Sequence, residues 1–410
     1  MTTTESTTPV LPSADEALRI AHSIAADIAA GAIERELTGA WPERELRQIG
    51  ESGLLGIIVP AAHGGPDLPR ATAVEVLRIL SQADSAVGQL LLSHFVLSQA
   101  ISGLEDNDPA PRIYRDVLAG AQLGNATVER GTRTSADRLT TVTRQSDGTW
   151  RLNGTKYYAT GTLGASWIAV AARIPDTEPS HGATVFVRPT DPGVTLNLDQ
   201  WSSFGQRGTA SGEVVFANVA VDGEFVIDEG PDPDPVTAPP SVLGAFDQAL
   251  HAAVDIGIAR AALEDGARFV TTKSRPWFEA GVDNAADEPH VVRRFGELTA
   301  RLYALEALLA QGAGLVDDAL NAPEITRDAA AAASLRVAAA KALAQEFAVE
   351  IASGIFELAG ASATDRGHAL DRHWRNVRVH SLHDPARWKY VHLGNHTLRG
   401  TKPPRLGVLL

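Results

Sequence analysis

The chain has 410 residues, of which 44% are hydrophobic and 21% charged, and these ordinary globular values at this length favour two or three packed domains. Its formal net charge of -14, without a dense run of Lys or Arg, argues against nucleic-acid and membrane-surface partners. The N-terminus lacks a signal-peptide pattern and no apolar run reaches bilayer length, so we expect a cytoplasmic protein.

Sulfur-containing side chains are almost absent from the sequence. Cysteine does not occur and Met1 is the only methionine, which excludes disulfides, thiolate metal sites and cysteine nucleophiles. Scarce sulfur could protect a protein that handles peroxides, because both residue types oxidise, or it could spare sulfur in a protein made during sulfur starvation. Compositional drift would explain the same observation without any function.

The first part of the chain predicts a helical domain. Ser13 opens a capping box ahead of an amphipathic stretch, and Pro42 and Gly56 mark the start and the end of a second helix. The expected helices span about residues 13–37, 42–56, 71–83 and 86–104. The last of these is nearly apolar and contains His94, which could be either a hydrogen-bonded core residue or a functional group.

The next hundred residues change to short alternating runs, which predict a β-barrel or sandwich domain. Strands are expected at about residues 139–143, 150–158, 167–171, 184–187 and 194–198. Asn125 and Thr127 lie where this region opens, in a segment that could also be a plain polar turn.

Two turn signals lie in this β-region. Asp147-Gly148 predicts a turn, and Asn153-Gly154 predicts a hairpin followed by a second strand. That second strand would place Tyr157 and Tyr158 on opposite faces of the sheet, one packed and one available.

The remainder of the chain predicts a linker and a helical bundle. Residues 229–240 are rich in Pro and Asp and show no periodicity, as in a linker. Helices are expected at 243–270, 295–316 and 328–358, the last capped by Gly360, and together they predict a four-helix bundle. No Gly-x-Gly-x-x-Gly motif follows a strand, so a Rossmann-bound nicotinamide or FAD is not supported.

Several motifs resemble the acyl-CoA dehydrogenase superfamily. Residues 153–161, read Asn-Gly-Thr-Lys-Tyr-Tyr-Ala-Thr-Gly, resemble the segment of its β-domain whose hydroxyl faces a flavin ring, and the N-terminal order Pro-Glu, Gly-Leu-Leu-Gly, Val-Pro, Gly-Gly is similar too. The resemblance covers essentially the whole chain. It implies an α+β fold with an N-terminal helical domain, a central β-barrel or sandwich domain and a C-terminal four-helix bundle, at residues 1–122, 123–232 and 233–410, and a homotetramer.

Two kinds of enzyme share that architecture. The dehydrogenases use FAD and a glutamate base, whereas the reduced-flavin-dependent (group D) monooxygenases, the dibenzothiophene monooxygenase branch, take FMNH2 from a separate NAD(P)H-dependent reductase and form a C4a-hydroperoxide with O2. In this chain the glutamate position falls on Asp384, one methylene shorter and followed by a rigid proline. His383 beside it resembles the histidine of the monooxygenase His-Asp-Pro motif. His380 and His383 could instead bind a metal or be structural.

The resemblance also assigns roles to individual residues. Catalytic roles fall to His383, His94 and Thr160, and substrate contacts to His94 and His380. The FMN ring would be bound by Asn125, Thr127, Tyr158, Thr160 and Trp201, and its phosphate by Arg275 and Lys273. For Arg275 and Lys273 the alternative is a surface-charged helix end.

We therefore expect an FMNH2-dependent monooxygenase that uses a C4a-hydroperoxyflavin to oxygenate a small organic substrate. The scarcity of sulfur favours an organosulfur compound and a role in sulfur scavenging. The alternatives are an FAD-dependent acyl-CoA dehydrogenase, a flavin-dependent N-hydroxylase of an amine or amino sugar, and a non-catalytic helical assembly protein.

Overall fold

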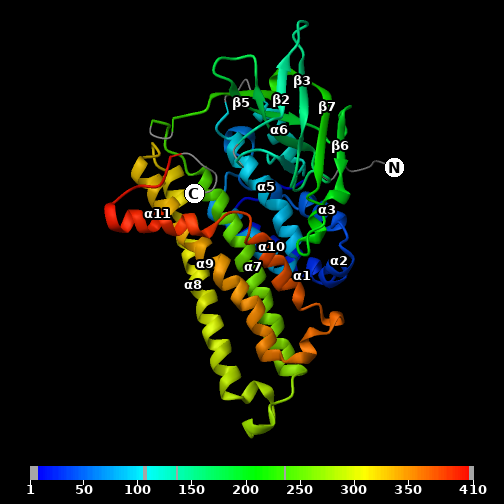
Figure 1. The fold of residues 1–410 in the computed structure, drawn as a ribbon, viewed down its shortest axis with the longest axis vertical. Coiled ribbons are helices and arrows are strands. Elements are labelled where there is room, and N and C mark those ends of the chain that lie inside the picture. Colours follow the sequence, from blue (N-terminus) through cyan, green and yellow to red (C-terminus); the bar gives the residue numbers. More distant parts are fainter. Residues whose placement is uncertain (1–7, 105–108, 135–136, 235–236, 406–410) are drawn as a thin grey trace.

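Helices at both ends of the chain enclose a central sheet domain. The structure, a computed structural model, describes residues 8–104, 109–134, 137–234 and 237–405. Figure 1 shows the sheet above a group of long helices, which confirms the predicted α+β architecture. The helices of the described residues are α1 (Ala14–Ala29), α2 (Ala32–Thr38), α3 (Glu43–Glu51), α4 (Arg70–Ala83), α5 (Ser85–Ile101), α6 (Ala110–Leu118), α7 (Leu243–Thr272), α8 (Pro289–Leu320), α9 (Arg327–Ala359), α10 (Asp371–His380) and α11 (Ala386–Arg399).

Among the N-terminal helices, the one expected over residues 71–83 forms as α4, whereas the first two begin as predicted but are shorter than expected. The Ser13 hydroxyl accepts a backbone N–H of the first turn at 3.3 Å and caps α1. The single helix expected over residues 13–37 divides at Ala30 and Gly31 into α1 and α2. The second expected helix ends at Glu51, because Gly53 adopts a φ of 85°, which a right-handed helix cannot contain.

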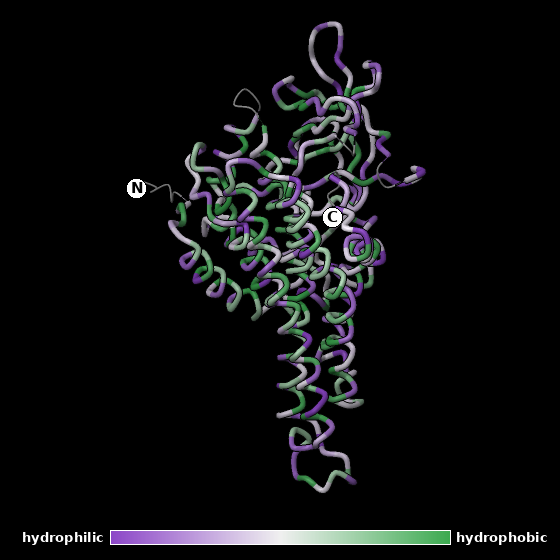
Figure 2. The backbone as a smooth tube through the Cα atoms, turned by 90° about the vertical axis from the view of Figure 1, so that its left-hand side faces the viewer, coloured by the Kyte–Doolittle hydropathy of each residue, from purple (hydrophilic) through white to green (hydrophobic). Residues whose placement is uncertain are grey.

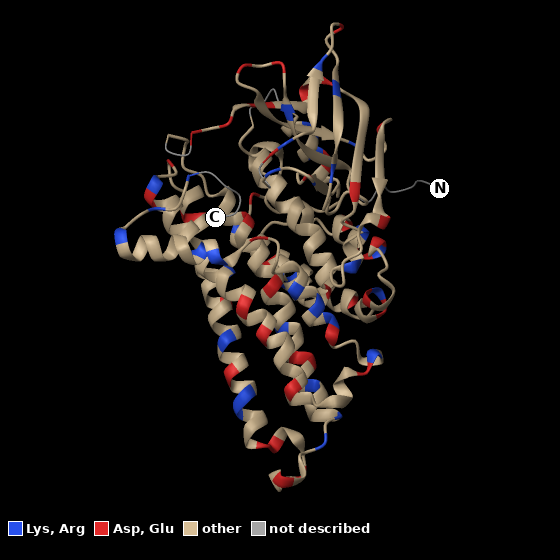
Figure 3. Cartoon of the chain, viewed as in Figure 1, with Lys and Arg blue, Asp and Glu red and all other residues tan. Residues whose placement is uncertain are grey.

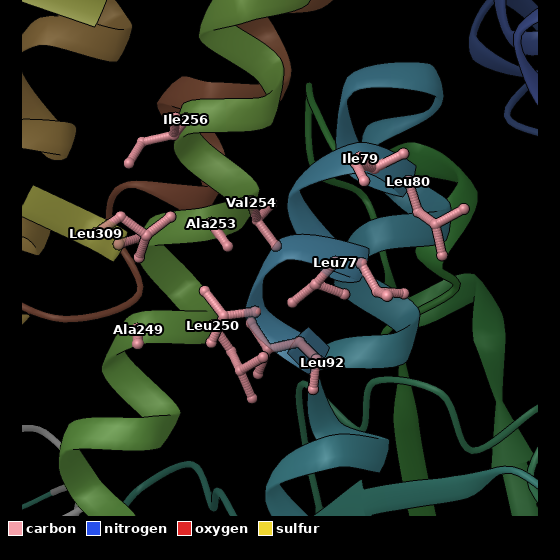
Figure 4. Packing of buried hydrophobic residues seen from close by; sticks show 14 of the residues in the cluster. Leu77, Ile79, Leu80, Leu92, Ala249, Leu250, Ala253, Val254, Ile256 and Leu309 are labelled. Atoms are coloured by element: carbon pink, nitrogen blue, oxygen red, sulfur yellow. The ribbon is translucent and has the colours of Figure 1, made fainter. Parts of the chain in front are cut away.

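The main hydrophobic core lies where α7 packs against α4 and α5. Figure 4 shows Leu77 of α4 and Leu92 of α5 pointing toward Leu250 of α7, and all three are buried. Each buried leucine stabilises the fold by about 1.5–3 kcal/mol. At Gly257 the helices approach so closely that a Cβ would lie 2.5 Å from a backbone carbonyl of α4. Helix α7 is therefore held firmly on its N-terminal neighbours.

The described strands form one sheet. They are β1 (Leu123–Ala126), β2 (Thr141–Arg144), β3 (Trp150–Lys156), β4 (Trp167–Ile174), β5 (His181–Val187), β6 (Val194–Asn197), β7 (Glu213–Val221) and β8 (Val226–Pro231). Their order is β6-β7-β3-β2-β4-β5-β8, with β1 parallel to β4. A parallel contact between β2 and β4, at Thr141 and Arg173, joins two antiparallel halves. Val142 and Leu152 lie opposite each other and are buried, as the alternating pattern requires.

The turn predicted at Asp147-Gly148 is confirmed. It connects β2 and β3, with Gly148 at a φ of 88° and the Gln145 N–H donating to the Thr149 carbonyl at 2.7 Å. This turn closes the β2–β3 hairpin.

The hairpin predicted at Asn153-Gly154 is wrong. Strand β3 runs through both residues, and its register against β7 shifts there, as in a β-bulge. The Asn153 side chain accepts the Asn218 N–H at 2.8 Å, and a Cβ on Gly154 would lie 2.3 Å from the Thr140 hydroxyl. The glycine is needed for close packing rather than for a turn. A separate second strand carrying Tyr157 and Tyr158 does not form, since β3 ends at Lys156.

Other elements extend beyond the sequence predictions. No prediction covered β7, β8, α6, α10 or α11. The linker expected over 229–240 overlaps β8, which runs to Pro231, and two of its residues, 235–236, lie outside the described residues.

The C-terminal helices extend away from the sheet. Helices α7, α8 and α9 pack along one another, and α10 lies against α7 and α9. Figures 1 and 2 show the far ends of these three long helices extending beyond the rest of the molecule. Gly360, at a φ of 79°, ends α9 as predicted.

Charged side chains are interspersed on these helices rather than gathered by sign (Figure 3). Glu350 of α9, for example, pairs with Arg294 and Arg301 of α8 at 3.0 and 3.1 Å. Among the described residues, no helix has an apolar stretch long enough to cross a bilayer.

Candidate active site

A chain of hydroxyl groups lies beyond the end of β3. The Thr160 and Ser211 hydroxyls are 2.9 Å apart, and Ser211 donates to the Thr209 hydroxyl at 2.8 Å. Thr209 in turn donates to the Gln206 carbonyl at 2.9 Å, which also accepts the Trp201 indole N–H at 2.9 Å. These bonds hold Thr160 and Trp201 in one rigid unit.

Asn125 and Tyr158 join the same unit. The Asn125 N–H donates to the Thr160 carbonyl at 3.1 Å, and the Tyr158 and Trp201 rings meet edge to face at 6.3 Å. Tyr158 is half exposed, at a φ of 54°. The Asn125 Oδ1 is buried and has no hydrogen-bond partner among the described residues. Because such an acceptor is costly to leave unpaired, it fits a ligand N–H such as that of a flavin ring.

The lysine of the Asn-Gly-Thr-Lys motif has a structural role beneath this unit. Lys156 is fully buried and its Nζ lies 2.5 Å from Glu129 Oε1 and 3.2 Å from the Thr127 carbonyl. It thereby fixes the segment after Asn125 to β3. Thr127 itself is exposed at its side chain, so its predicted contact with the flavin edge stays a prediction.

Helix α10 is locked to the β-domain. The Gln206 N–H donates to Asn376 Oδ1 at 2.6 Å, and the Asn376 amide donates to Glu36 of α2 at 3.0 Å. Glu36 also pairs with Arg375 at 2.5 Å. At Gly205 the backbones approach so closely that a Cβ would lie 2.1 Å from the Arg375 carbonyl. This junction sets the position of the α10 C-terminus relative to the hydroxyl chain, and sequence motifs did not indicate Glu36 or Asn376.

His383 lies in the turn after α10, with its side chain 45% exposed. Its ring stacks on His251 of α7 with centroids 3.8 Å apart, and its Nδ1 lies 3.5 Å from Asp384 Oδ1. Asp384 is buried and paired with Lys389 at 2.6 Å. Burial alone would raise the pKa of Asp384, but His383, Lys341 and Lys389 outweigh it and hold the pKa well below its usual range.

The ionised Asp384 therefore favours an N–H on His383 Nδ1, which leaves Nε2 as a hydrogen-bond acceptor. A carboxylate with a depressed pKa and a lysine partner is a weak proton acceptor, so Asp384 is a poor replacement for a dehydrogenase base.

Behind His383 lies a line of buried polar groups, of which sequence reasoning singled out only His380. His251 Nδ1 is 3.1 Å from His380 Nε2, His380 Nδ1 is 2.7 Å from Asp255 Oδ1, and Asp255 Oδ2 is 2.7 Å from Lys341 Nζ. Asp247 Oδ1 lies 3.7 Å from His251 Nε2. The available signal was the spacing of Asp247, His251 and Asp255, four residues apart in the largely apolar first half of α7. We call Asp247, His251, His380, Asp255 and Lys341 the buried relay.

The predicted substrate contact of His380 is not supported by its position. Both ring nitrogens are engaged, by Asp255 and His251, and the residue is buried. Burial lowers its pKa, with Lys341 and His383 acting in the same direction against the opposing effect of Asp255.

His94 is also engaged on both sides. Its Nε2 lies 2.8 Å from the Leu55 carbonyl, and its Nδ1 accepts the Leu123 N–H at 3.2 Å. Burial lowers its pKa to about 4, so the ring is neutral. These contacts leave neither nitrogen for the predicted catalytic or substrate role, and they give His94 the task of anchoring β1 just before Asn125.

Arg275 and Lys273 lie at the opposite end of α7 from His251. A helix rises about 1.5 Å per residue, so roughly 30 Å separates His251 from the end of α7 at Thr272. Both side chains are exposed, and Lys273 Nζ is 3.3 Å from His368 Nδ1. One chain therefore does not place these two cations beside His251.

Comparison with known proteins covers the same three regions. Residues 17–103, 125–219 and 249–388 match the N-terminal, middle and C-terminal domain models of acyl-CoA dehydrogenase. Dibenzothiophene monooxygenase from Rhodococcus qingshengii is 32% identical over 406 residues, covering 95% of this chain and 94% of that protein. The probable FMNH2-dependent monooxygenase SfnC from Pseudomonas putida is 28% identical, covering 94% and 96%. The crystal structure of FMN-bound TdsC from Paenibacillus sp. A11-2 matches with a TM-score of 0.89 at 30% identity, covering 96% of this chain and 100% of that chain.

Proposed function

Because the chain belongs to the acyl-CoA dehydrogenase family, in the branch of its flavin-dependent monooxygenases, we propose that it is the oxygenase component of a two-component system that oxygenates an organosulfur compound for sulfur scavenging. The scarcity of Cys and Met supports the choice of substrate class. Its cofactor is FMN, used as FMNH2 with O2.

The β-domain residues fit the flavin ring. The unpaired Asn125 Oδ1 can accept from a ring N–H, the Thr160 hydroxyl can donate to or accept from a ring nitrogen, and Tyr158 and Trp201 flank them with aromatic surface. Reduced FMN supplies the two electrons with which one oxygen atom of O2 enters the substrate and the other leaves as water.

The environment of His383 is the observation that carries the proposal. An exposed imidazole has its Nδ1 toward the ionised Asp384, and its Nε2 has no hydrogen-bond partner among the described residues. The Nε2 atom can accept a proton from an oxygen atom beside it and return it. The buried carboxylate next to it is paired with Lys389 and has little tendency to take a proton from an acyl substrate.

Arg275 and Lys273 are proposed to bind the FMN phosphate of a neighbouring subunit in a homotetramer. Their place at the end of α7 that lies roughly 30 Å from His251 supports this arrangement. Trp277 and Phe278, at the same end of α7, are 61% and 79% exposed and offer apolar area for a subunit contact. An NAD(P)H-dependent flavin reductase would supply FMNH2 in the cytoplasm.

The direct test is oxygen insertion with chemically reduced FMN across a panel of thioethers, sulfones, sulfinates, sulfonates and amines. We expect an oxygenated organosulfur product from the wild type and a large loss of product with His383→Ala. The exposed His396 of α11 provides the matched control His396→Ala. Oxidised product from amines alone would redirect the proposal to N-hydroxylation, and no oxygenated product from any compound would refute it.

One observation favours the rival acyl-CoA dehydrogenase. Asp247 is a buried carboxyl near His383, and burial raises its pKa to about 6, a value suited to a proton acceptor. An acyl-CoA dehydrogenase would form enoyl-CoA with an artificial electron acceptor, and its Asp247→Asn variant would not. We expect no enoyl-CoA from the wild type or from Asp247→Asn.

A further inference from the structure

The buried relay connects the helical core to the ring beneath His383. It begins at the Lys341 and Asp255 pair, of which both side chains are fully buried, and passes through His380 to His251. Among the described residues, no group of three His, Asp or Glu side chains is arranged to hold a metal ion. We therefore explain the buried relay by its hydrogen bonds and the positions of its protons.

The relay determines where each proton lies. Asp255 is ionised: burial would raise its pKa, but Lys341 and His380 hold it lowered. It accepts a hydrogen bond from His380 Nδ1, so a neutral His380 has a lone pair on Nε2. His251 must then donate from Nδ1 to His380 Nε2, 3.1 Å away. The tautomers of both histidines follow from a single ion pair.

The same arrangement keeps His251 neutral. Burial first, then His383, His380, Lys341 and Lys389, lower the pKa of His251 well below its ordinary value. The opposing charges are Asp247, 3.7 Å from its Nε2, and Asp255 and Asp384 on the far sides of His380 and His383. A proton on His251 would place two cationic rings face to face when His383 is protonated, since their centroids are 3.8 Å apart.

We propose that His251 is a positioning residue for His383: it supports the ring from below and, by staying neutral, leaves to His383 any proton that the stacked pair takes up. This inference rests on the proposed function, because it takes His383 to be the group that exchanges a proton with the reacting oxygen. A neutral His251 ring places no positive charge against His383 when His383 binds a proton. The stacked contact also limits rotation of the His383 ring.

Proton positions provide a test that needs neither flavin nor turnover. Neutron diffraction from the deuterated protein near pH 7 is expected to show deuterium on Nδ1 and not on Nε2 of both His251 and His380. Deuterium on both nitrogens of His251, or on its Nε2 alone, would overturn the proposal.

Two variants distinguish the loss of the stacked ring beneath His383 from a general loss of folding. His251→Ala removes the ring, and we expect about fivefold more hydrogen peroxide released per FMNH2 oxidised and a shift of the pH profile of product yield. His251→Phe retains a flat, uncharged ring against His383, and its peroxide release is expected to remain within about twofold of the wild type. FMN affinity and unfolding midpoint, measured for both, report a merely structural effect.

The outcomes distinguish the two levels of the proposal. Wild-type values of peroxide release and pH profile in His251→Ala, or a His251→Phe variant as impaired as His251→Ala, would overturn the role of His251 while leaving the monooxygenase assignment intact. If the wild type oxygenates nothing, the proposed function fails, and the neutron result still decides whether the tautomers are those inferred. If His251→Ala does not fold, His251→Phe and the neutron result remain decisive.

Discussion

Replacing Lys341 by methionine tests whether the relay is held by its ion pair. The Lys341 Nζ and Asp255 Oδ2 atoms are 2.7 Å apart and both side chains are fully buried, so the substitution leaves a buried carboxylate without its cation. Removing one partner of a buried pair costs about 3–5 kcal/mol. Because His380 still donates to Asp255, we expect a loss near the lower end, about 3 kcal/mol, in urea unfolding at pH 8.

The loss should depend on pH in a defined direction. Lys341 lowers the pKa of His380, so its removal raises that pKa and lets His380 take up the missing charge. A native state that binds a proton more readily than the wild-type native state gains stability relative to it as the pH falls through the raised pKa, and loses that gain as the pH rises. Lys341→Met should therefore be less destabilising at pH 6 than at pH 8, by as much as about 1.4 kcal/mol per pH unit.

Two controls accompany this measurement. The double variant Lys341→Met with Asp255→Leu removes both charges and should recover much of the stability, because apolar replacement of a buried pair is often neutral. Lys402→Met breaks an exposed pair with Asp328 and should leave the unfolding midpoint unchanged. A loss below about 1 kcal/mol in Lys341→Met at pH 8, or equal losses at both pH values, would refute the reasoning.

Three further predictions concern the site and its supports. Thr160→Val removes the hydroxyl and should weaken FMN binding by about three- to tenfold in an anaerobic fluorescence titration, whereas Thr160→Ser should bind as the wild type does. Gly205→Ala places a Cβ 2.1 Å from the Arg375 carbonyl and should lower the unfolding midpoint and product yield together, while Gly296→Ala, where nothing lies within 4 Å, should lower neither. The depressed pKa of Asp384 stabilises the fold above the usual aspartate range, so urea resistance should fall below about pH 4 in the wild type and change less in Asp384→Asn.

The choice of His383 as the chemical group at the centre of the site came from the sequence, and it stays a prediction. The His383-Asp384-Pro385 segment stands where a dehydrogenase needs a longer carboxylate, and the structure leaves His383 half exposed with Asp384 buried and ion-paired. The Thr160 segment was predicted from a motif that is contiguous in the chain, and its contact with the flavin stays a prediction. The structure adds the bonds from Thr160 to Asn125 and Ser211 that hold the segment in place.

Errors arose where one local pattern is compatible with two tertiary settings. Asn153-Gly154 is a strong hairpin signal, yet the Thr140 side chain and β7 leave room there only for a glycine in a bulge. His94 lies on an apolar helix, and whether its nitrogens are free depended on the Leu55 carbonyl and the Leu123 N–H, which belong to other elements.

Residues close together in the chain were enough to predict the order of the three domains, the helix periods and the turn at Asp147-Gly148. The exchange of a catalytic carboxylate for the His383 imidazole was also predicted from a short segment and awaits its test. The buried relay, by contrast, depends on contacts between residues far apart in the chain. Lys341 and Asp255 are separated by 86 positions and His380 and Asp255 by 125, and no local pattern records which distant polar group satisfies a buried one. That choice is made when α7, α9 and α10 pack together, since burial makes each unpaired charge costly and leaves few partners within reach.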